Sequence, residues 1–435
     1  MYHFIGIKGA GMSALAIILK QLGNDVKGSD VDKHFFTEEG LIKNNIEFYV
    51  YDEKNIRPND IIIKGASITN DNPELIKAKE LNLKIYEYNE MVGELTKKLK
   101  TITIAGCHGK TTTTAMMAHV LNNIVGISYL IGDGTGYANL ENEFFALEAC
   151  EYKRHFLAYQ PYYAVITNID LDHVDYFKGI DDVIDAYQEY ASKAIKKVIA
   201  YGEDKHIKKM TLKNDIFYFG LNKDDNLYAT EITYHNKGIK FKVIAEGEEY
   251  GNFDLPLYGE HQLLDALAVI SICYLEQINS NDVQKHFSTF KGAKRRFSET
   301  IIENNVIIDD YAHHPAEIIS TINAIKQKYP NKKIVAIFQP HTFTRTKEFA
   351  NDLVDIFNEV DASYIMDIHP AREKQEDFPD ITSNIIIDKT QNSYHIDINE
   401  SEKLAKYDNT VFVFMSPNDI KKLENDLKNK LEIKK

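Results

Sequence analysis

The sequence predicts an α/β protein with mostly parallel sheets, divided into three units. Apolar stretches of strand length alternate with helix-like stretches along most of the 435 residues, which is typical of layered α/β folds. This rhythm restarts twice, near residue 98 and again after residue 297. At about 150 residues per domain, the length suggests two to four domains, and the two restarts place three domains at residues 1–98, 99–298 and 299–435.

The first unit opens with a strand and a helix. Tyr2 to Gly6 predicts a short buried strand, and Met12 to Leu22 predicts a helix that ends at Gly23. Further strands are expected at Ile61 to Ile63 and at Ile85 to Tyr88. A charged, helix-like segment at residues 94–100 then leads into the second unit.

The second and third units continue the alternation. Strands are expected at Thr101 to Ala105 and Ala164 to Asn168. A hairpin is expected around Asn236-Lys237-Gly238, because apolar residues alternate on both sides of it, at Ile232, Tyr234, Ile239, Phe241 and Val243. The strand candidates of the third unit are Val306 to Ile308, Ile334 to Phe338, Tyr364 to Ile368 and Val411 to Met415.

Composition excludes several classes of protein. With 44% hydrophobic and 27% charged residues, the chain is not a disordered protein. The net charge of −14 argues against non-specific binding to nucleic acid or anionic lipid. The cysteines at positions 107, 150 and 273 lack CxxC spacing, so neither a disulfide framework nor a zinc site is expected.

We expect a cytoplasmic protein. The longest apolar run, Ala266 to Leu275, is too short to span a membrane. The apolar stretch Ile5 to Leu19 contains Lys8 and has neither a basic leader nor a small-residue cleavage site, so it does not predict a signal peptide.

The central chemical motif follows the strand at residues 101–105. The sequence Gly106-Cys107-His108-Gly109-Lys110, continued by three threonines, leads from that strand into a helix. Such a turn directs backbone N–H groups and the positive end of the helix dipole at one point, which favours phosphate. The lysine supplies a charge for the β- and γ-phosphates, and Thr111 a hydroxyl for Mg²⁺. The motif predicts ATP binding, although the loop is shorter than the usual P-loop spacing.

Two acidic loops follow further predicted strands. They are Glu148-Ala-Cys-Glu151 and Asn168-Ile-Asp170-Leu-Asp172-His173. Each loop alone fits a solvated turn or a helix cap. In the same chain as a phosphate loop, and at the carboxyl ends of strands, a shared Mg²⁺ site is favoured.

The amino terminus carries a second glycine turn. Gly6-Ile-Lys8-Gly9-Ala-Gly11-Met-Ser13 lies between a strand and a helix, with Ser29-Asp30 about 20 residues further on. The glycines run GxxGxG rather than GxGxxG, so NAD binding is disfavoured. The diphosphate of another nucleotide fits this helix start equally well.

Polar clusters also follow the strands of the third unit. Lys294-Arg295-Arg296 is a compact basic cluster that suits a transferring phosphate. Asp309 to Pro315 contains two adjacent histidines, and Gln339 to Arg345 contains His341. A single histidine is usually only a surface residue, but the repetition after successive strands favours a site.

Taken together, the motifs resemble the Mur ligase family over essentially the whole chain. In order, they are GIKGAGMS, GCHGKTTTT, EACE, TNIDLDH, KRRF, DDYAHHP and FQPHTFTRT. The first and the last two resemble the family members that add L-alanine. The resemblance implies a Rossmann-like N-terminal domain for a UDP-sugar, a central P-loop ATPase domain with a mostly parallel sheet, and a Rossmann-like C-terminal domain.

The resemblance also implies a reaction in peptidoglycan precursor synthesis, and therefore a part in cell wall formation, cell shape and division. The carboxylate of UDP-N-acetylmuramate attacks the γ-phosphate of ATP to form an acyl phosphate. The amine of L-alanine then attacks the carbonyl carbon, and phosphate leaves. The partners implied are these two substrates, with ATP and Mg²⁺ as cofactors.

Site residues are carried over by position. The catalytic residues implied are Lys110, His173, Arg296, His341 and Arg345. ATP would be bound by Gly106, His108, Gly109, Lys110, Thr111, Thr112, His261, Arg296 and Asp310. Mg²⁺ would be held by Thr111, Glu148 and His173. The substrates would be bound by Lys8, Gly9, Ala10, Gly11, Met12, Ser13, Ser29, Asp30, His314 and Arg345.

The chain departs from the family pattern at several positions. His261 matches the pattern that contacts adenine, whereas Gln262 and Asp265 do not. Thr342 stands where many relatives have arginine, and Ser416-Pro417-Asn418 replaces part of a glycine-rich loop.

Alternative functions remain at this stage. The nearest is a ligase that joins a recycled murein tripeptide to the same UDP-sugar, which the FQPHTFTRT stretch disfavours. A non-catalytic, nucleotide-dependent switch and a dehydrogenase fit less of the chain. For Cys107, beside Lys110 and a helix start, we expect either a thiol of lowered pKa that reacts with alkylating reagents or a buried inert side chain.

Overall fold

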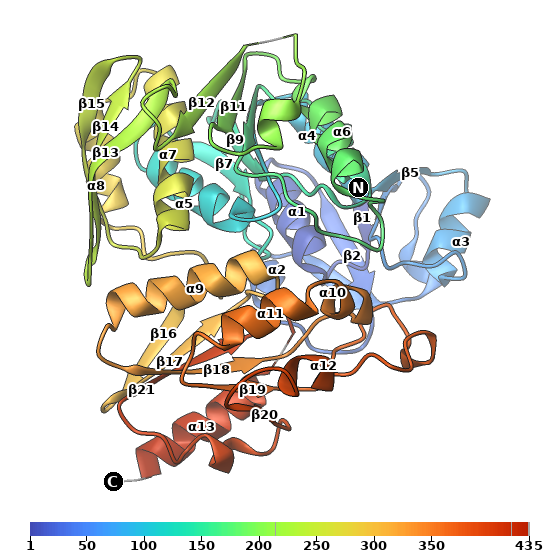
Figure 1. The fold of residues 1–435 in the computed structure, drawn as a ribbon. Helices are drawn as coiled ribbons and strands as arrows, with labels where there is room; N and C mark the ends of the chain where they lie inside the picture. The colour runs from blue at the N-terminus through green and yellow to red at the C-terminus, as the bar shows by residue number, and fades with distance from the viewer. Residues whose placement is uncertain (214, 419, 434–435) are drawn as a thin grey trace.

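The computed structural model describes residues 1–213, 215–418 and 420–433. Within these residues the strands form three sheets, one after the other along the chain, with helices packed against them (Figure 1). Most neighbouring strands are parallel. The predicted three-domain α/β fold with mostly parallel sheets is therefore confirmed.

The N-terminal sheet has the strand order β3-β2-β1-β4-β5, and all its neighbours are parallel. The order reverses beside β1, so the glycine turn between β1 and α1 lies at the switch point where open α/β sheets bind ligands. The strands are β1 Tyr2–Ile5, β2 Val26–Asp30, β3 Glu47–Val50, β4 Ile61–Lys64 and β5 Lys84–Glu87. The helices are α1 Ala10–Gln21, α2 Glu38–Lys43, α3 Pro73–Glu80 and α4 Tyr88–Thr96.

The start of α4 differs from the prediction. The helix begins at Tyr88, where the sequence suggested a strand, and it ends at Thr96 rather than running over residues 94–100. A capping box between Glu87 and Glu90 sets this start, because it satisfies backbone N–H groups of the first turn.

The central sheet has the order β15-β14-β13-β12-β11-β10-β6-β9-β7-β8. Strand β6 lies between β9 and β10 and is parallel to both, so the loops after these three strands meet at one edge. The strands are β6 Lys100–Ala105, β7 Ile127–Leu130, β8 Gly136–Tyr137, β9 Phe144–Glu148, β10 Tyr163–Ile166, β11 Lys197–Tyr201, β12 Ile216–Gly220, β13 Leu227–His235, β14 Gly238–Ala245 and β15 Glu248–Leu255. The helices are α5 Lys110–Asn122, α6 Ile180–Ala191, α7 Glu260–Leu275 and α8 Ser280–Phe287.

The predicted hairpin is present as β13 and β14, which pair antiparallel. Along β14 the predicted alternation is correct, since the three residues on which it was based, at 239, 241 and 243, are buried. Along β13 it is wrong at Tyr234, which is exposed. The register shifts between Thr230 and Thr233, and such a bulge changes the face to which the following side chains point.

The C-terminal sheet has the order β16-β17-β21-β18-β19-β20 and is parallel except for β16. Strand β19 ends at Ile365, earlier than the predicted Ile368. The strands are β16 Ser298–Ile302, β17 Asn305–Asp310, β18 Lys333–Phe338, β19 Ala362–Ile365, β20 Ser393–His395 and β21 Thr410–Met415. The helices are α9 Pro315–Lys328, α10 Phe343–Glu348, α11 Ala350–Phe357, α12 Asn384–Ile387 and α13 Lys421–Ile433.

The N-terminal and central domains share one hydrophobic core. A continuous cluster of buried apolar residues extends from α1 and α4 to Phe145, Phe156 and Tyr190 of the central domain. Backbones also approach closely there: a Cβ on Gly93 would lie 2.5 Å from the carbonyl oxygen of Ala158. The C-terminal domain has its own apolar clusters on the two faces of its sheet. It meets the central domain mainly through the polar contacts described below.

Within the described residues, the helices fall short of the length and apolarity that crossing a bilayer demands.

Candidate functional site

The phosphate loop lies at the centre of the molecule. Strand β6 ends at Ala105, and α5 begins at Lys110 after Gly109, whose φ is +82°. The side chains of Thr167 and Asn168, which follow β10, hold this loop: both donate to the carbonyl oxygen of His108, at 2.6 and 2.9 Å. The Asn168 carboxamide oxygen also accepts the backbone N–H of His108 at 2.9 Å. The loop is thus fixed in place by the neighbouring strand.

Lys110 is paired with a carboxylate. Its Nζ lies 2.9 Å from Oε2 of the buried Glu151 and donates to the Gly106 carbonyl oxygen at 2.5 Å. Burial alone would lower the pKa of Lys110, but the Glu151 carboxylate outweighs it and the pKa is raised. The lysine is therefore charged, and a phosphate must replace Glu151 as its partner. Glu151 belongs to the EACE motif, but pairing with Lys110 was not among the roles predicted for it.

The candidate Mg²⁺ ligands lie in two pairs: Thr111 contacts Glu148, and His173 lies beside Glu151. The Thr111 hydroxyl donates to Glu148 at 3.0 Å, and the other Glu148 oxygen accepts the backbone N–H of Gly132 at 2.7 Å. His173 Nε2 lies 3.4 Å from Glu151. Burial raises the pKa of Glu148, so a cation beside it would favour its charged form. Hydroxyl and carboxylate oxygens are the donors that Mg²⁺ prefers, so Thr111 and Glu148 fit the ion, whereas His173 lies beside Glu151 instead.

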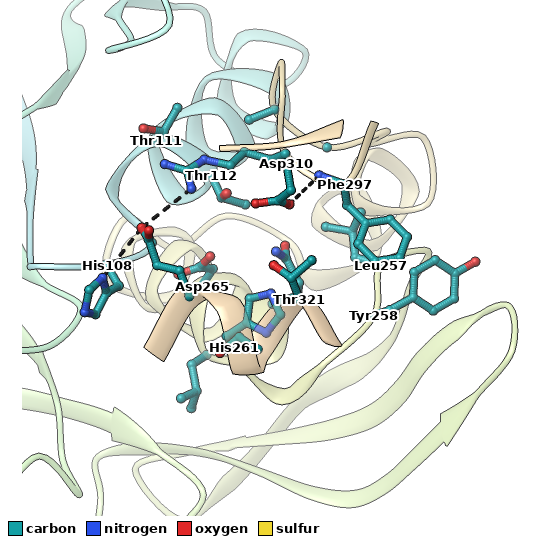
Figure 2. Close-up of a pocket in the computed structure, with 18 of the residues that line it drawn as sticks. His108, Thr111, Thr112, Leu257, Tyr258, His261, Asp265, Phe297, Asp310 and Thr321 are labelled. Carbon is teal, nitrogen blue, oxygen red and sulfur yellow. Dashed lines mark hydrogen bonds and ion pairs between the residues drawn. The ribbon is translucent and has the colours of Figure 1, made fainter. Parts of the chain in front are cut away.

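A cavity of about 390 Å³ lies between the central and C-terminal domains. Figure 2 shows His108, His261, Asp265 and Asp310 around it. One end is apolar and aromatic, and the other is formed by the phosphate loop. These features suit a nucleotide with a flat base and a charged tail. Its lining includes the predicted ATP residues His108, Gly109, Thr111, Thr112, His261, Arg296 and Asp310, and also Leu257, Tyr258, Phe297, Glu317 and Thr321.

Burial sets the charge of several groups in this cavity. It lowers the pKa of His261 to about 4, so that ring is neutral. It raises the pKa of Asp310 to about 6, and the Asp310 carboxylate accepts the backbone N–H groups of Phe297 and Ala312, both at 2.8 Å. Asp265, one of the departures from the family pattern, accepts the Thr113 hydroxyl at 2.9 Å. This hydrogen bond joins α7 to the first turn of α5.

A second polar cluster crosses the same domain boundary. Arg345 Nη2 lies 2.5 Å from Asp172 Oδ1, and both side chains are nearly buried. Arg345 Nη1 lies 3.3 Å from His341 Nδ1. Burial, together with nearby cationic groups, lowers the pKa of His341 to about 3. The structure thus brings together the two predicted residues His341 and Arg345, and it adds Asp172.

The two adjacent histidines point to different places. The ring of His313 lies 6.1 Å from that of His341, beside the Arg345 cluster. The predicted substrate residue His314 instead packs against His108, with ring centroids 4.6 Å apart and the rings tilted by 37°, and caps α9 by accepting the backbone N–H of Ala316. The structure therefore places His313, rather than His314, with the candidate substrate groups.

The charged side chains at the N-terminal turn contact other residues of the same domain. Lys8 Nζ lies 2.9 Å from Glu38 Oε1, and Asp30 accepts the backbone N–H of Lys8 at 2.7 Å. Ser29 is fully buried and its hydroxyl donates to Glu74, so that side chain faces the domain interior. The other predicted substrate residues, Gly9, Ala10, Gly11, Met12 and Ser13, form the turn and the first residues of α1.

Cys107 is a buried thiol. Its Sγ donates to the Asp170 carbonyl oxygen at 3.0 Å. Burial raises its pKa well above the usual range, and the Glu151 carboxylate adds to this effect, while Lys110 only partly offsets it. The expectation of a lowered pKa was therefore wrong, and the alternative of a buried side chain is supported.

Three family models match consecutive parts of the chain. They are the "Mur ligase family, catalytic domain" at residues 1–100, the "Mur ligase middle domain" at residues 104–273 and the "Mur ligase, glutamate ligase domain" at residues 295–414. Together they span nearly all of the three domains.

Solved structures resemble the whole chain. A UDP-N-acetylmuramate-alanine ligase from Thermotoga maritima is 27% identical, with a TM-score of 0.81 over 100% of this chain and 99% of that one. A murein peptide ligase from Psychrobacter arcticus is 19% identical, with a TM-score of 0.72 over 99% and 98%. A MurF ligase from Thermotoga maritima, solved in complex with ADP, is 16% identical, with a TM-score of 0.66 over 95% and 96%. The last two show likeness of fold alone.

The glycine that opens the phosphate loop provides a first test. Gly106 has φ +146°, and a Cβ there would lie 2.0 Å from Thr167 Oγ1. In Gly106→Ala we expect the affinity for ADP, measured by calorimetry with Mg²⁺, to fall about tenfold or more, because backbone strain of about 1–3 kcal/mol and the clash displace the loop. Gly247→Ala is the control, since Gly247 also has positive φ but open space around it. Equal affinity in both variants would contradict this account of the loop.

The burial of Cys107 provides a second test. When the folded protein is treated with iodoacetamide, we expect the exposed Cys150 to be modified before the buried Cys107 and Cys273, because the pKa of all three thiols is raised and access therefore decides the order. Mass spectrometry of peptides at successive times measures the order. Modification of Cys107 as fast as Cys150 in the folded protein would show that this thiol is accessible.

Proposed function

Because the chain belongs to the Mur ligase family, whose members are ATP-dependent ligases of peptidoglycan precursors, we propose that it joins L-alanine to the carboxylate of UDP-N-acetylmuramate. ATP is converted to ADP and phosphate. One observation carries the proposal. A cavity that suits a nucleotide runs between two domains, and the His341–Arg345 cluster crosses the boundary of the same two domains.

The first step is a phosphoryl transfer. The substrate carboxylate attacks the γ-phosphorus, the bond to the β-phosphate oxygen breaks, and ADP leaves. Negative charge on the moving group must be stabilised. We assign this to the backbone N–H groups at the start of α5, to Lys110 after it exchanges Glu151 for phosphate, and to Arg296 from the facing side of the cavity. Thr111, Glu148 and His173 would hold Mg²⁺, which would supply positive charge to stabilise the transferring phosphate.

The second step forms the amide. The amine of L-alanine attacks the acyl phosphate carbonyl, the tetrahedral intermediate expels phosphate, and the departing phosphate takes up the proton that the amine loses. We assign His341 and Arg345 to the binding of the amino acid and the reacting carboxylate. With a pKa of about 3, His341 is a weak base. Its neutral ring is better suited to accept a hydrogen bond from the amine than to hold its proton.

Three features support L-alanine as the acceptor. The relative that covers this chain at 27% identity is a UDP-N-acetylmuramate-alanine ligase, and the DDYAHHP and FQPHTFTRT motifs resemble the alanine-adding members. The ring centroids of His313 and His341, one from each of these two motifs, lie 6.1 Å apart.

The second candidate is the joining of a murein tripeptide to the same UDP-sugar. The likeness in fold to a murein peptide ligase is the reason to test it. A product of either activity serves the cell wall, on which cell shape and division depend.

The test is the release of phosphate from ATP with Mg²⁺ and UDP-N-acetylmuramate, adding L-alanine, glycine, L-serine or the tripeptide one at a time. We expect release that depends on L-alanine and falls about a hundredfold or more in Lys110→Ala, because a group that stabilises the transferring phosphate is lost. Lys326→Ala, at an exposed ion pair on α9, is the control. Turnover only with tripeptide would favour the second candidate, and release that needs no acceptor would exclude both.

A further inference from the structure

Glu317 lies among three cationic or imidazole groups that come from separate motifs. It sits in the first turn of α9, and its side chain is 14% exposed. Its Oε1 lies 3.6 Å from His108 Nδ1 and 3.6 Å from Arg296 Nη1. Its Oε2 lies 3.3 Å from His313 Nδ1. One carboxylate of the C-terminal domain thus reaches the phosphate loop, the basic cluster and the histidine pair.

The ring of His108 depends on this carboxylate for its position. The backbone of His108 is fixed by Thr167 and Asn168, but among the described residues neither ring nitrogen has a hydrogen-bond partner, although both are buried. Asp170 lies 3.7 Å from Nε2, opposite Glu317, and the tilted ring of His314 packs against the His108 ring. Two carboxylates, one from each domain, therefore orient the ring.

We propose that Glu317 is a positioning residue: when the C-terminal domain docks on the central domain, its carboxylate holds the His108 ring and the Arg296 guanidinium at the phosphate end of the nucleotide cavity. This inference deepens the proposed function and rests on it for the identity of the ligand. Glu317 itself touches no reacting atom in this assignment. It acts through His108 and Arg296, both of which line the cavity.

The charges around His108 agree with this role. Burial alone would lower the pKa of His108, but the carboxylates of Asp170 and Glu317, with a contribution from Asp172, raise it to about 9. The facing ring of His314 has a pKa lowered to about 4, mainly by burial, so it is neutral and adds no positive charge. His108 is thus a cation beside the start of α5 when Glu317 is docked. Undocking removes one of its two nearest carboxylates and weakens that charge.

A purely structural role for Glu317 can be separated from positioning. Its carboxylate also accepts the backbone N–H groups of His313 and His314, at 3.1 and 3.4 Å, as part of the capping box of α9. The amide oxygen of a glutamine accepts the same hydrogen bonds. Glu317→Gln therefore keeps the cap and removes the charge.

The experiment compares Glu317→Gln with Glu359→Gln. Glu359 pairs at the exposed surface with Lys326 of α9, the helix that also carries Glu317, with 2.8 Å between Oε2 and Nζ. Glu359→Gln therefore also removes one carboxylate near α9. The titration of His108 is followed by NMR of protein labelled at histidine, with the signal assigned by its loss in His108→Gln. ADP binding with Mg²⁺ is measured by calorimetry in the same variants.

In Glu317→Gln we expect the pKa of His108 to fall by about one pH unit or more, because one of its opposite charges is lost, and ADP affinity to fall about tenfold. Glu359→Gln should change neither quantity. The loss of ADP affinity caused by Glu317→Gln should be smaller when His108 is already glutamine, since part of the effect passes through that ring. An unchanged His108 titration in Glu317→Gln would overturn the proposal, whatever happens to thermal stability.

These readouts are independent of the ligase reaction. Neither the titration nor ADP binding requires UDP-N-acetylmuramate or L-alanine. If the titration shifts while phosphate release fails with every acceptor, the positioning role stands and the proposed reaction falls. If phosphate release depends on L-alanine while the His108 titration is unchanged in Glu317→Gln, the reaction stands and the positioning role falls.

Discussion

The buried ion pair between Asp172 and Arg345 is the contact on which the candidate site depends. It joins the loop after β10 in the central domain to α10 in the C-terminal domain, with 2.5 Å between Oδ1 and Nη2. An isolated charge in such a place is costly, and losing one partner of a buried pair costs about 3–5 kcal/mol. The two domains therefore satisfy these charges only when they are docked. The nucleotide cavity needs the same arrangement, because both domains line it.

The two domain boundaries differ in the kind of contact that holds them together. The N-terminal and central domains share one apolar core, and apolar packing of that kind resists rearrangement. The C-terminal domain contacts the central domain through ion pairs and hydrogen bonds, such as Arg372 with Asp175 and Gln327 with the carbonyl oxygens of His235 and Gly238. Polar contacts of this kind can be exchanged for contacts with a ligand. Closure of this boundary would also keep water from an acyl phosphate.

The charged groups of the site are already paired in the structure. Lys110 is paired with Glu151, Arg345 with Asp172, and Arg296 and His108 lie beside Glu317. An anionic nucleotide would take the place of Glu151 beside Lys110, whereas Glu317 would remain beside His108 and Arg296 and hold them at the phosphate end of the cavity. The carboxylates keep the cations charged and oriented despite burial, so that little reorganisation is needed when phosphate arrives.

Local patterns in the sequence predicted the strands and the phosphate loop, because a strand, a glycine turn and a helix start are encoded by neighbouring residues. The partners of the loop could not be predicted in this way. Asn168, Asp265 and Glu317 support it from other strands and helices, so their roles follow from tertiary placement. His313 and His314 are adjacent, yet only the structure shows that capping of α9 turns His314 toward His108. The pKa of Cys107 was misjudged because burial outweighs the nearby lysine.

The most direct test of the dependence on docking is small-angle X-ray scattering of the protein with Asp172→Asn, which leaves Arg345 without its buried carboxylate. We expect the radius of gyration to increase relative to the unmodified protein, since the C-terminal domain separates from the central domain. Excess ADP with Mg²⁺ should partly reverse this increase, because the nucleotide bridges the two domains. A radius of gyration that stays the same, with and without ADP, would contradict the claim that this ion pair holds the site together.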